Sequence, residues 1–96
     1  MSKNKIQIEE EDSVILREIL KRYPYKFYVY GSRSRGYASR YSDLDIFCKE
    51  KIREADVVDI KAQFEESNIT INVDIIDAGS CSQEFIKTIE KDLKGL

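Results

Sequence analysis

The feature that most constrains the fold is a run of alternating apolar and polar residues between positions 69 and 77. The run reads Ile-Thr-Ile-Asn-Val-Asp-Ile-Ile-Asp. Because successive side chains on a β-strand point to opposite faces, this pattern predicts a strand with one apolar and one polar face. The polar face carries Thr70, Asn72 and Asp74, and plain exposure to solvent is the simplest reason for it.

Two further segments are typical of strands, and the remaining segments are typical of helices. Residues 26–30 are aromatic and β-branched, and residues 43–49 alternate in polarity. Helical spacing of apolar residues predicts helices over 9–23, over 52–67 and from Ser80 or Ser82 to Gly95, with a turn and a short helix between 32 and 42. This order predicts an α/β (α+β) fold, a small mixed sheet of about three strands with helices packed mainly on one face.

The chain has 96 residues and no repeat or Pro/Gly-rich linker. We expect a single domain over residues 1–96, with residues 1–8 frayed and Glu9 to Asp12 forming a solvated helix start. Cys48 and Cys81 lack a disulfide or zinc spacing, and no apolar run approaches the roughly 20 residues that span a bilayer. These features predict a cytoplasmic protein without membrane contact.

The chain contains no histidine, and its 18 acidic residues outnumber its 16 basic ones. Without imidazole, the chain alone cannot form a Ser-His-Asp or Cys-His nucleophile system or a histidine-ligated zinc site. The net charge of −2 argues against general nucleic-acid binding. Any catalysis must therefore use carboxylates, hydroxyls, backbone amides, Lys or Arg, with or without a metal ion.

The most specific motif joins the first two predicted strands. Gly31-Ser32 ends the first strand, and Asp43 and Asp45 lie two positions apart on the second. A Gly-Ser turn between a strand and a helix lets the backbone approach a phosphate. Two carboxylates on one face of a strand repel each other unless a cation lies between them. Mg²⁺ takes such oxygen ligands and is often shared with substrate phosphates.

Asp74, on the polar face of the third predicted strand, is the candidate for a third carboxylate. Three carboxylates would let two metal ions flank the attacking and leaving oxygens. Asp77 is the alternative, although Asp74 has the better strand parity. Arg33, Arg35 and Arg40 lie between the turn and the acidic pair, where they would either neutralise a triphosphate or serve as solubilising charge.

The segment from Gly31 to Ile46, GSRSRGYASRYSDLDI, resembles the signature of the DNA polymerase β-type nucleotidyltransferases. More narrowly, it resembles the small stand-alone minimal nucleotidyltransferases, whose pattern is GS-x-A-R-G followed by S-D-x-D. The resemblance extends to the "VDIID" strand and the closing helix. One position departs from the pattern, because Ser34 stands where alanine is usual.

The resemblance implies a polymerase β-like core that moves a nucleoside monophosphate, AMP from ATP, to a hydroxyl group. It implies catalytic and metal-binding roles, with two Mg²⁺ ions, for three residues: Asp43, Asp45 and Asp74. Asp74 would also help to deprotonate the acceptor. It implies nucleotide-binding roles for four residues: Gly31, Ser32, Arg35 and Ser42.

The resemblance also implies a partner protein. Such chains are commonly encoded beside a helical HEPN-type or "substrate-binding" protein, and some act as antitoxins that adenylylate a tyrosine of that partner. A homo-oligomer is a further possible assembly. Two other functions stay open: a non-catalytic antitoxin subunit that neutralises its partner by forming a complex, and a nucleotide sensor without transfer.

Each part of the motif also has a purely structural interpretation. Gly31-Ser32 would then be an ordinary strand-ending turn, and Asp43 and Asp45 a charged strand edge. The tyrosines around the motif would pack instead of stacking on a base, namely Tyr28, Tyr30, Tyr37 and Tyr41. The occurrence of Gly-Ser and Asp-x-Asp together at this spacing favours the nucleotide-binding interpretation.

Overall fold

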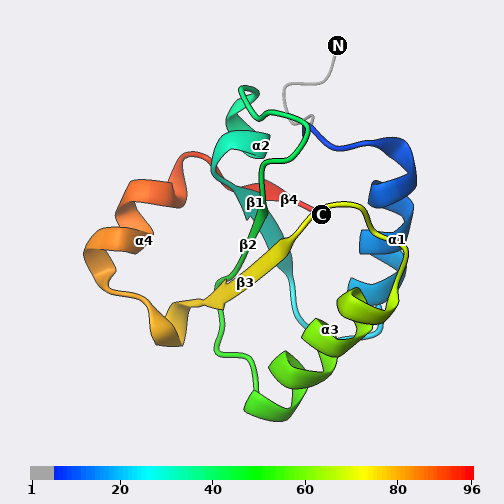
Figure 1. Ribbon diagram of the computed structural model, residues 1–96. Coiled ribbons are helices and arrows are strands. Elements are labelled where there is room, and N and C mark those ends of the chain that lie inside the picture. The colour runs from blue at the N-terminus through cyan, green and yellow to red at the C-terminus, as the bar shows by residue number, and fades with distance from the viewer. Residues whose placement is uncertain (1–5) are drawn as a thin grey trace.

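A four-stranded mixed sheet forms the centre of the computed structural model, which describes residues 6–96 (Figure 1). The strand order is β3-β2-β1-β4. β1 runs antiparallel to β2 and β4, whereas β2 and β3 are parallel. The expected mixed sheet is confirmed, with one strand more than predicted. The strands are β1 (Phe27–Tyr30), β2 (Leu44–Cys48), β3 (Val73–Asp77) and β4 (Lys94–Gly95).

Helices lie on both sides of this sheet. The two long helices contact each other on one side, as predicted, and α4 lies on the opposite side (Figure 1). The side chain of Ser82 accepts the Phe85 N–H at 3.1 Å, which caps α4 where the sequence placed a helix start. The helices are α1 (Glu10–Leu20), α2 (Ser32–Arg35), α3 (Glu54–Glu66) and α4 (Gln83–Glu90), with a 3₁₀ turn, η1 (Ala78–Ser80).

The hydrophobic core lies between the sheet and the two long helices. Val29, Ile46 and Ile75 are aligned across three strands and point toward α1 and α3. Leu16 of α1 and Ile60 of α3 are fully buried against them. The neighbouring row of the sheet has the opposite parity and therefore lies on the α4 side, where Tyr30 contacts Phe85 edge to face at 6.1 Å.

Glu9, Glu10 and Glu11 are exposed at the start of α1, as predicted, but Asp12 is buried, which corrects the prediction for that residue. Asp12 is only 1% exposed, and its carboxylate accepts the Thr70 N–H at 2.9 Å and the Thr70 hydroxyl at 2.6 Å. The Thr70 N–H thus bonds to Asp12 and not to a neighbouring strand, and in the segment before Val73 the Asn72 carbonyl accepts the Leu44 N–H at 2.8 Å. The strand predicted over 69–77 is shorter and covers 73–77.

Two predictions for the ends of the chain are also corrected. The last helix ends at Glu90, and Lys94–Gly95 instead pairs with Tyr28 and Val29 of β1, whose outer backbone groups need partners. Residues 6–8 are held rather than frayed, because Ile6 packs in the core and the Gln7 N–H donates to the Arg33 carbonyl at 2.8 Å. The predicted fraying of residues 1–5 lies outside the described residues.

Cys48 and Cys81 are free thiols, and burial raises the pKa of both. Within residues 6–96, no helix is long and apolar enough to cross a bilayer.

Candidate active site

A row of three side chains crosses the sheet on the α4 side. Tyr30 of β1 is the register partner of Asp45 of β2, and Asp45 is the register partner of Asp74 of β3. Neighbouring strands are about 4.8 Å apart, so the two carboxylates project side by side. Asp43 lies two positions before Asp45 and has the same parity. Asp43, Asp45 and Asp74 are named the acidic row from here on.

The acidic row is electrostatically strained in the absence of a counter-charge. Burial raises the pKa of Asp45, and the charges of Asp74 and Asp43 raise it further. Burial, together with the charges of Asp45 and Asp74, raises the pKa of Tyr30 to about 12. A cation beside the row would offset the like-charge part of these shifts, because like charges at short range disfavour the ionised form.

The Gly31-Ser32 turn lies directly against this row. Gly31 has a φ of 80°, which only glycine adopts without strain, and it precedes α2. A Cβ atom at Gly31 would lie 2.7 Å from Oδ2 of Asp45, closer than a Cβ atom approaches a non-bonded heavy atom. The glycine therefore allows both the turn and the close approach of backbone to carboxylate.

Arg33 has a role that the sequence did not predict. It is only 4% exposed, and its guanidinium donates to backbone carbonyls of Gln7 at 2.7 Å, Arg40 at 2.9 Å and Ser42 at 2.9 Å. The prediction that Arg33 neutralises a triphosphate is wrong, because its donors are already used inside the protein. Its place in the motif was visible in the sequence, but the residue type suggested an exposed cation.

Arg35, Arg40 and Ser42 lie in or beside the loop that Arg33 holds. Arg35 and Arg40 are exposed, and each guanidinium lies over a tyrosine ring, Tyr37 at 5.0 Å and Tyr41 at 6.0 Å. The Ser42 hydroxyl accepts the Ser39 N–H at 2.9 Å. Arg35 is therefore exposed beside the Gly31-Ser32 turn, with its Nε 3.9 Å from a carboxylate oxygen of Asp92, whereas Ser42 shapes the loop.

Ser34 and Asp77 have structural contacts. The Ser34 hydroxyl donates to the carbonyl of Asp92, which links α2 to the chain after α4. Asp77 is buried and accepts the Ile52 N–H at 2.7 Å and the Ser80 hydroxyl at 2.9 Å. Asp77 has the parity opposite to Asp74, so it does not join the acidic row.

The acidic row suits a hard divalent cation in donor type and in register. Its donors are carboxylate oxygens, the ligands that Mg²⁺ prefers. Burial and then the like charges of Asp74 and Asp43 raise the pKa of Asp45, and a cation would compensate those like charges. Within the described part of the chain, no three Asp, Glu or Cys side chains are already arranged to hold a metal ion. The fit therefore concerns the kind and placement of the residues, and not a preformed coordination sphere.

Comparison with known proteins points in the same direction. Residues 7–96 match the family model described as "Polymerase beta, Nucleotidyltransferase". The chain is also 32% identical over 90 residues to the "Probable protein adenylyltransferase MntA" of Haemophilus influenzae, an alignment that covers 90% of this chain and 79% of that protein.

Proposed function

Because this chain belongs to the polymerase β nucleotidyltransferase family, among its minimal nucleotidyltransferases, we propose that it transfers AMP from ATP to a hydroxyl group of a protein. The observation that carries the proposal is the register of Asp45 with Asp74, directly against the Gly31-Ser32 turn. The name of the relative, a probable protein adenylyltransferase, supports AMP as the group and a protein as the acceptor.

In the proposed reaction the acceptor oxygen bonds to the α-phosphorus of ATP, and the bond from that phosphorus to the β-phosphate oxygen breaks. Pyrophosphate leaves, and Asp74 takes the proton of the acceptor hydroxyl. The acidic row would hold two Mg²⁺ ions, which when bound supply positive charge to the triphosphate and to the leaving group. Gly31 leaves space for the phosphates, the Ser32 hydroxyl donates to them, and Arg35 adds an exposed positive charge.

Arg33 and Ser42 would act indirectly in this scheme. Arg33 bonds to the carbonyl of Ser42, the residue before Asp43, and belongs to the same helix as Ser32. It therefore joins the phosphate turn to the first carboxylate of the acidic row. Holding both parts in one geometry before substrate arrives lowers the cost of orienting them during the reaction.

The proposed acceptor is a tyrosine of a small helical HEPN-type partner, in a toxin-antitoxin-like pair. Asp74 is exposed at the edge strand of the sheet, where a second protein could present a hydroxyl. A single domain over residues 1–96, a cytoplasmic location and a possible homo-oligomer complete the proposal, and each stays a prediction from the sequence.

The test is transfer of label from α-³²P-ATP to the helical protein encoded next to this chain, with Mg²⁺ present. Label on that protein is expected with the unchanged chain and with the surface variant Glu65→Gln. The pair Asp43→Asn and Asp45→Asn should reduce labelling by at least about a hundredfold. Full labelling by this pair, or no label on any acceptor, would contradict the proposal. Binding of Mg-ATP by calorimetry without turnover would instead favour the nucleotide sensor.

A further inference from the structure

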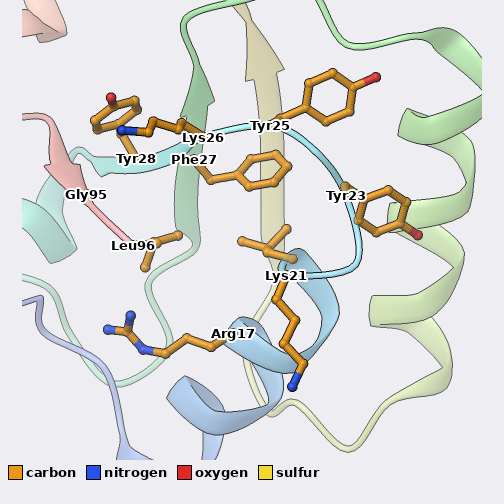
Figure 2. A pocket seen from close by; sticks show the side chains of 10 residues that line it. Arg17, Lys21, Tyr23, Tyr25, Lys26, Phe27, Tyr28, Gly95 and Leu96 are labelled. Atoms are coloured by element: carbon orange, nitrogen blue, oxygen red, sulfur yellow. The ribbon is translucent and has the colours of Figure 1, made fainter.

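A hollow of about 430 Å³ lies at the other end of β1 from the acidic row (Figure 2). Its lining comes from the end of α1, the linker into β1, and Gly95 and Leu96 after the last helix. A strand rises about 3.3 Å per residue, so Phe27 at this hollow and Gly31 at the turn are roughly 13 Å apart. The hollow is therefore separate from the candidate active site.

The floor and walls of the hollow are apolar and well supported. Leu20 and Phe27 are buried core residues, and Leu96 packs beside them. Tyr25 contacts Phe27 edge to face at 6.1 Å, and its hydroxyl donates to Asp56 of α3 at 2.6 Å. The Tyr23 hydroxyl donates to Asp59 of the same helix. These bonds fix the aromatic walls, so the hollow is part of the folded structure and not a gap that side chains can readily close.

The charged side chains that line the hollow are all basic, although Asp56, Asp59 and Glu18 bond to lining residues from outside it. Its charged lining residues are Arg17, Lys21 and Lys26, with no acidic residue, in a chain whose net charge is −2. Lys21 pairs with Glu18 at 3.0 Å, but Lys26 has no hydrogen-bond or ion-pair partner within residues 6–96. In the view of Figure 2, the Arg17 guanidinium and the Lys26 ammonium lie on opposite sides of Leu96.

We propose that this basic hollow, lined by Leu20, Phe27 and Leu96 with Arg17 and Lys26 at its rim, docks an acidic amphipathic helix of another protein. Apolar side chains of the helix fill the floor, and flanking carboxylates meet the two cations. The uncharged lining consists mainly of four aromatic residues and two leucines, an apolar surface that the apolar face of a helix can cover, and the test below distinguishes a helix from a nucleotide. Docking here requires no nucleotide transfer, so it goes beyond the proposed reaction.

The probe is a synthetic fourteen-residue peptide with Leu at positions i, i+3, i+4 and i+7 and Glu elsewhere. The ¹⁵N-labelled full chain is titrated with this peptide, and amide shifts are followed by NMR. We expect saturable shifts at residues 17–28 and 95–96, with little change at the Gly31-Ser32 turn. Raising NaCl from roughly 0.05 M to roughly 0.3 M should weaken binding several-fold, because the rim charges are exposed to solvent.

Charge-reversal variants test the two cations directly. Arg17→Glu with Lys26→Glu should weaken binding at least about tenfold, since two attractions become repulsions. The matched control Lys61→Glu, on the outer surface of α3, makes the same kind of change elsewhere and should alter binding less than about twofold. Leu96→Ser should weaken binding without unfolding the chain, because Leu96 lies at the edge of the core, and the amide spectrum verifies the fold.

Several outcomes would overturn the proposal. One is equal affinity for a control peptide that has Lys in place of Glu. Another is unchanged peptide affinity in the Arg17→Glu, Lys26→Glu variant. A third is a set of amide shifts confined to the acidic row. Mg-ATP moving the amides of the basic hollow in place of the peptide would identify a nucleotide site. Concentration-dependent shifts of these amides without peptide would identify a second copy of the chain as the occupant. None of these results depends on whether AMP transfer occurs, so failure of docking and failure of the proposed reaction are distinguishable.

Discussion

The buried guanidinium of Arg33 bonds to the carbonyl of Ser42 through two nitrogens, with Nε at 3.0 Å and Nη2 at 2.9 Å. Ser42 directly precedes Asp43, and Arg33 directly follows Ser32. A single side chain thus links the turn proposed to bind phosphate to the segment that carries Asp43 and Asp45.

Arg33→Met should destabilise the chain by about 3 kcal/mol, because it leaves several buried carbonyls without a donor. Arg33→Lys should recover part of this loss and part of the transfer activity, since it keeps the charge but not the fork of donors. Urea unfolding followed by circular dichroism measures the free energy. Arg40→Met, in the same loop but exposed, is the control and should change stability by less than about 0.5 kcal/mol. An equal loss of stability in both Met variants would show that the hydrogen bonds of Arg33 do not stabilise the fold.

Gly31→Ala should cost more than Gly36→Ala, although both glycines have positive φ values of 80° and 89°. A methyl group at Gly36 meets no atom within 4 Å, so only backbone strain of about 1 kcal/mol is expected. At Gly31 the methyl group would also displace the Asp45 carboxylate. We expect AMP transfer to fall at least about tenfold for Gly31→Ala and by less than twofold for Gly36→Ala, measured as labelling rates on folded protein. Similar rates for the two variants would show that contact with Asp45 is unimportant.

Asp45→Asn should stabilise the folded chain at neutral pH in metal-free buffer, while abolishing transfer. Because the folded-state pKa of Asp45 is raised above its ordinary value of 3.8, the folded state binds a proton more readily than the unfolded state. Stability therefore falls as pH rises from about 3.8 through the raised pKa, and the amide removes this loss. A gain of about 0.5 kcal/mol, or a few degrees in Tm, is expected by differential scanning calorimetry with EDTA. A lower Tm at pH 7 would contradict this account of the acidic row.

Asp77→Asn should have the opposite effect on stability and destabilise the folded chain at neutral pH. Burial alone would raise the pKa of Asp77, but the Ile52 N–H, the Ser80 hydroxyl and Lys51 together lower it below 3.8. A lowered folded-state pKa contributes stability above the unfolded value that is lost as pH falls through the folded value. We expect a loss of about 1–3 kcal/mol at pH 7 for the variant, and a smaller difference from the unchanged chain near pH 3. Urea unfolding at both pH values measures the difference in free energy of unfolding between the variant and the unchanged chain. The same difference at both pH values would refute the charge-dependent role of Asp77.

Mg²⁺ should raise the Tm of the unchanged chain and leave that of the Asp43→Asn, Asp45→Asn pair nearly unaltered. A ligand that binds only the folded state stabilises it in proportion to the logarithm of its concentration over its dissociation constant. Titration of Mg²⁺ in a thermal-shift assay, with Ca²⁺ and NaCl at matched ionic strength as controls, separates binding from screening. An equal shift in both proteins would place the ion outside the acidic row.

Local pattern was sufficient for much of the fold. β1, β2 and α3 begin and end within about two residues of the predicted limits, because strand and helix periods are written in short windows of sequence. Parity alone also placed Asp45 and Asp74 on one face, and the register of β2 with β3 then brought them together. β4 was missed, since two residues carry no period and pair only because β1 presents a free edge.

Two buried charges and the basic hollow could not be predicted from the sequence. Arg33 and Asp12 look like surface charges in the sequence, and both are buried with full sets of partners. The basic hollow was equally invisible, because its lining joins α1 and β1 to Gly95 and Leu96, far along the chain.

The sequence alone was enough to predict a small mixed sheet with a glycine turn and carboxylates on one face, because periodicity and residue chemistry are local properties. It also excluded any chemistry that needs an imidazole. The tertiary structure decides which charged side chains are exposed, which form buried hydrogen bonds that stabilise the fold, and which stay available to bind a ligand. Asp12 bonds to Thr70, 58 positions away, whereas Asp74 is left exposed beside Asp45. That difference arises because the cost of burying a charge depends on partners that only the folded chain brings within hydrogen-bonding distance.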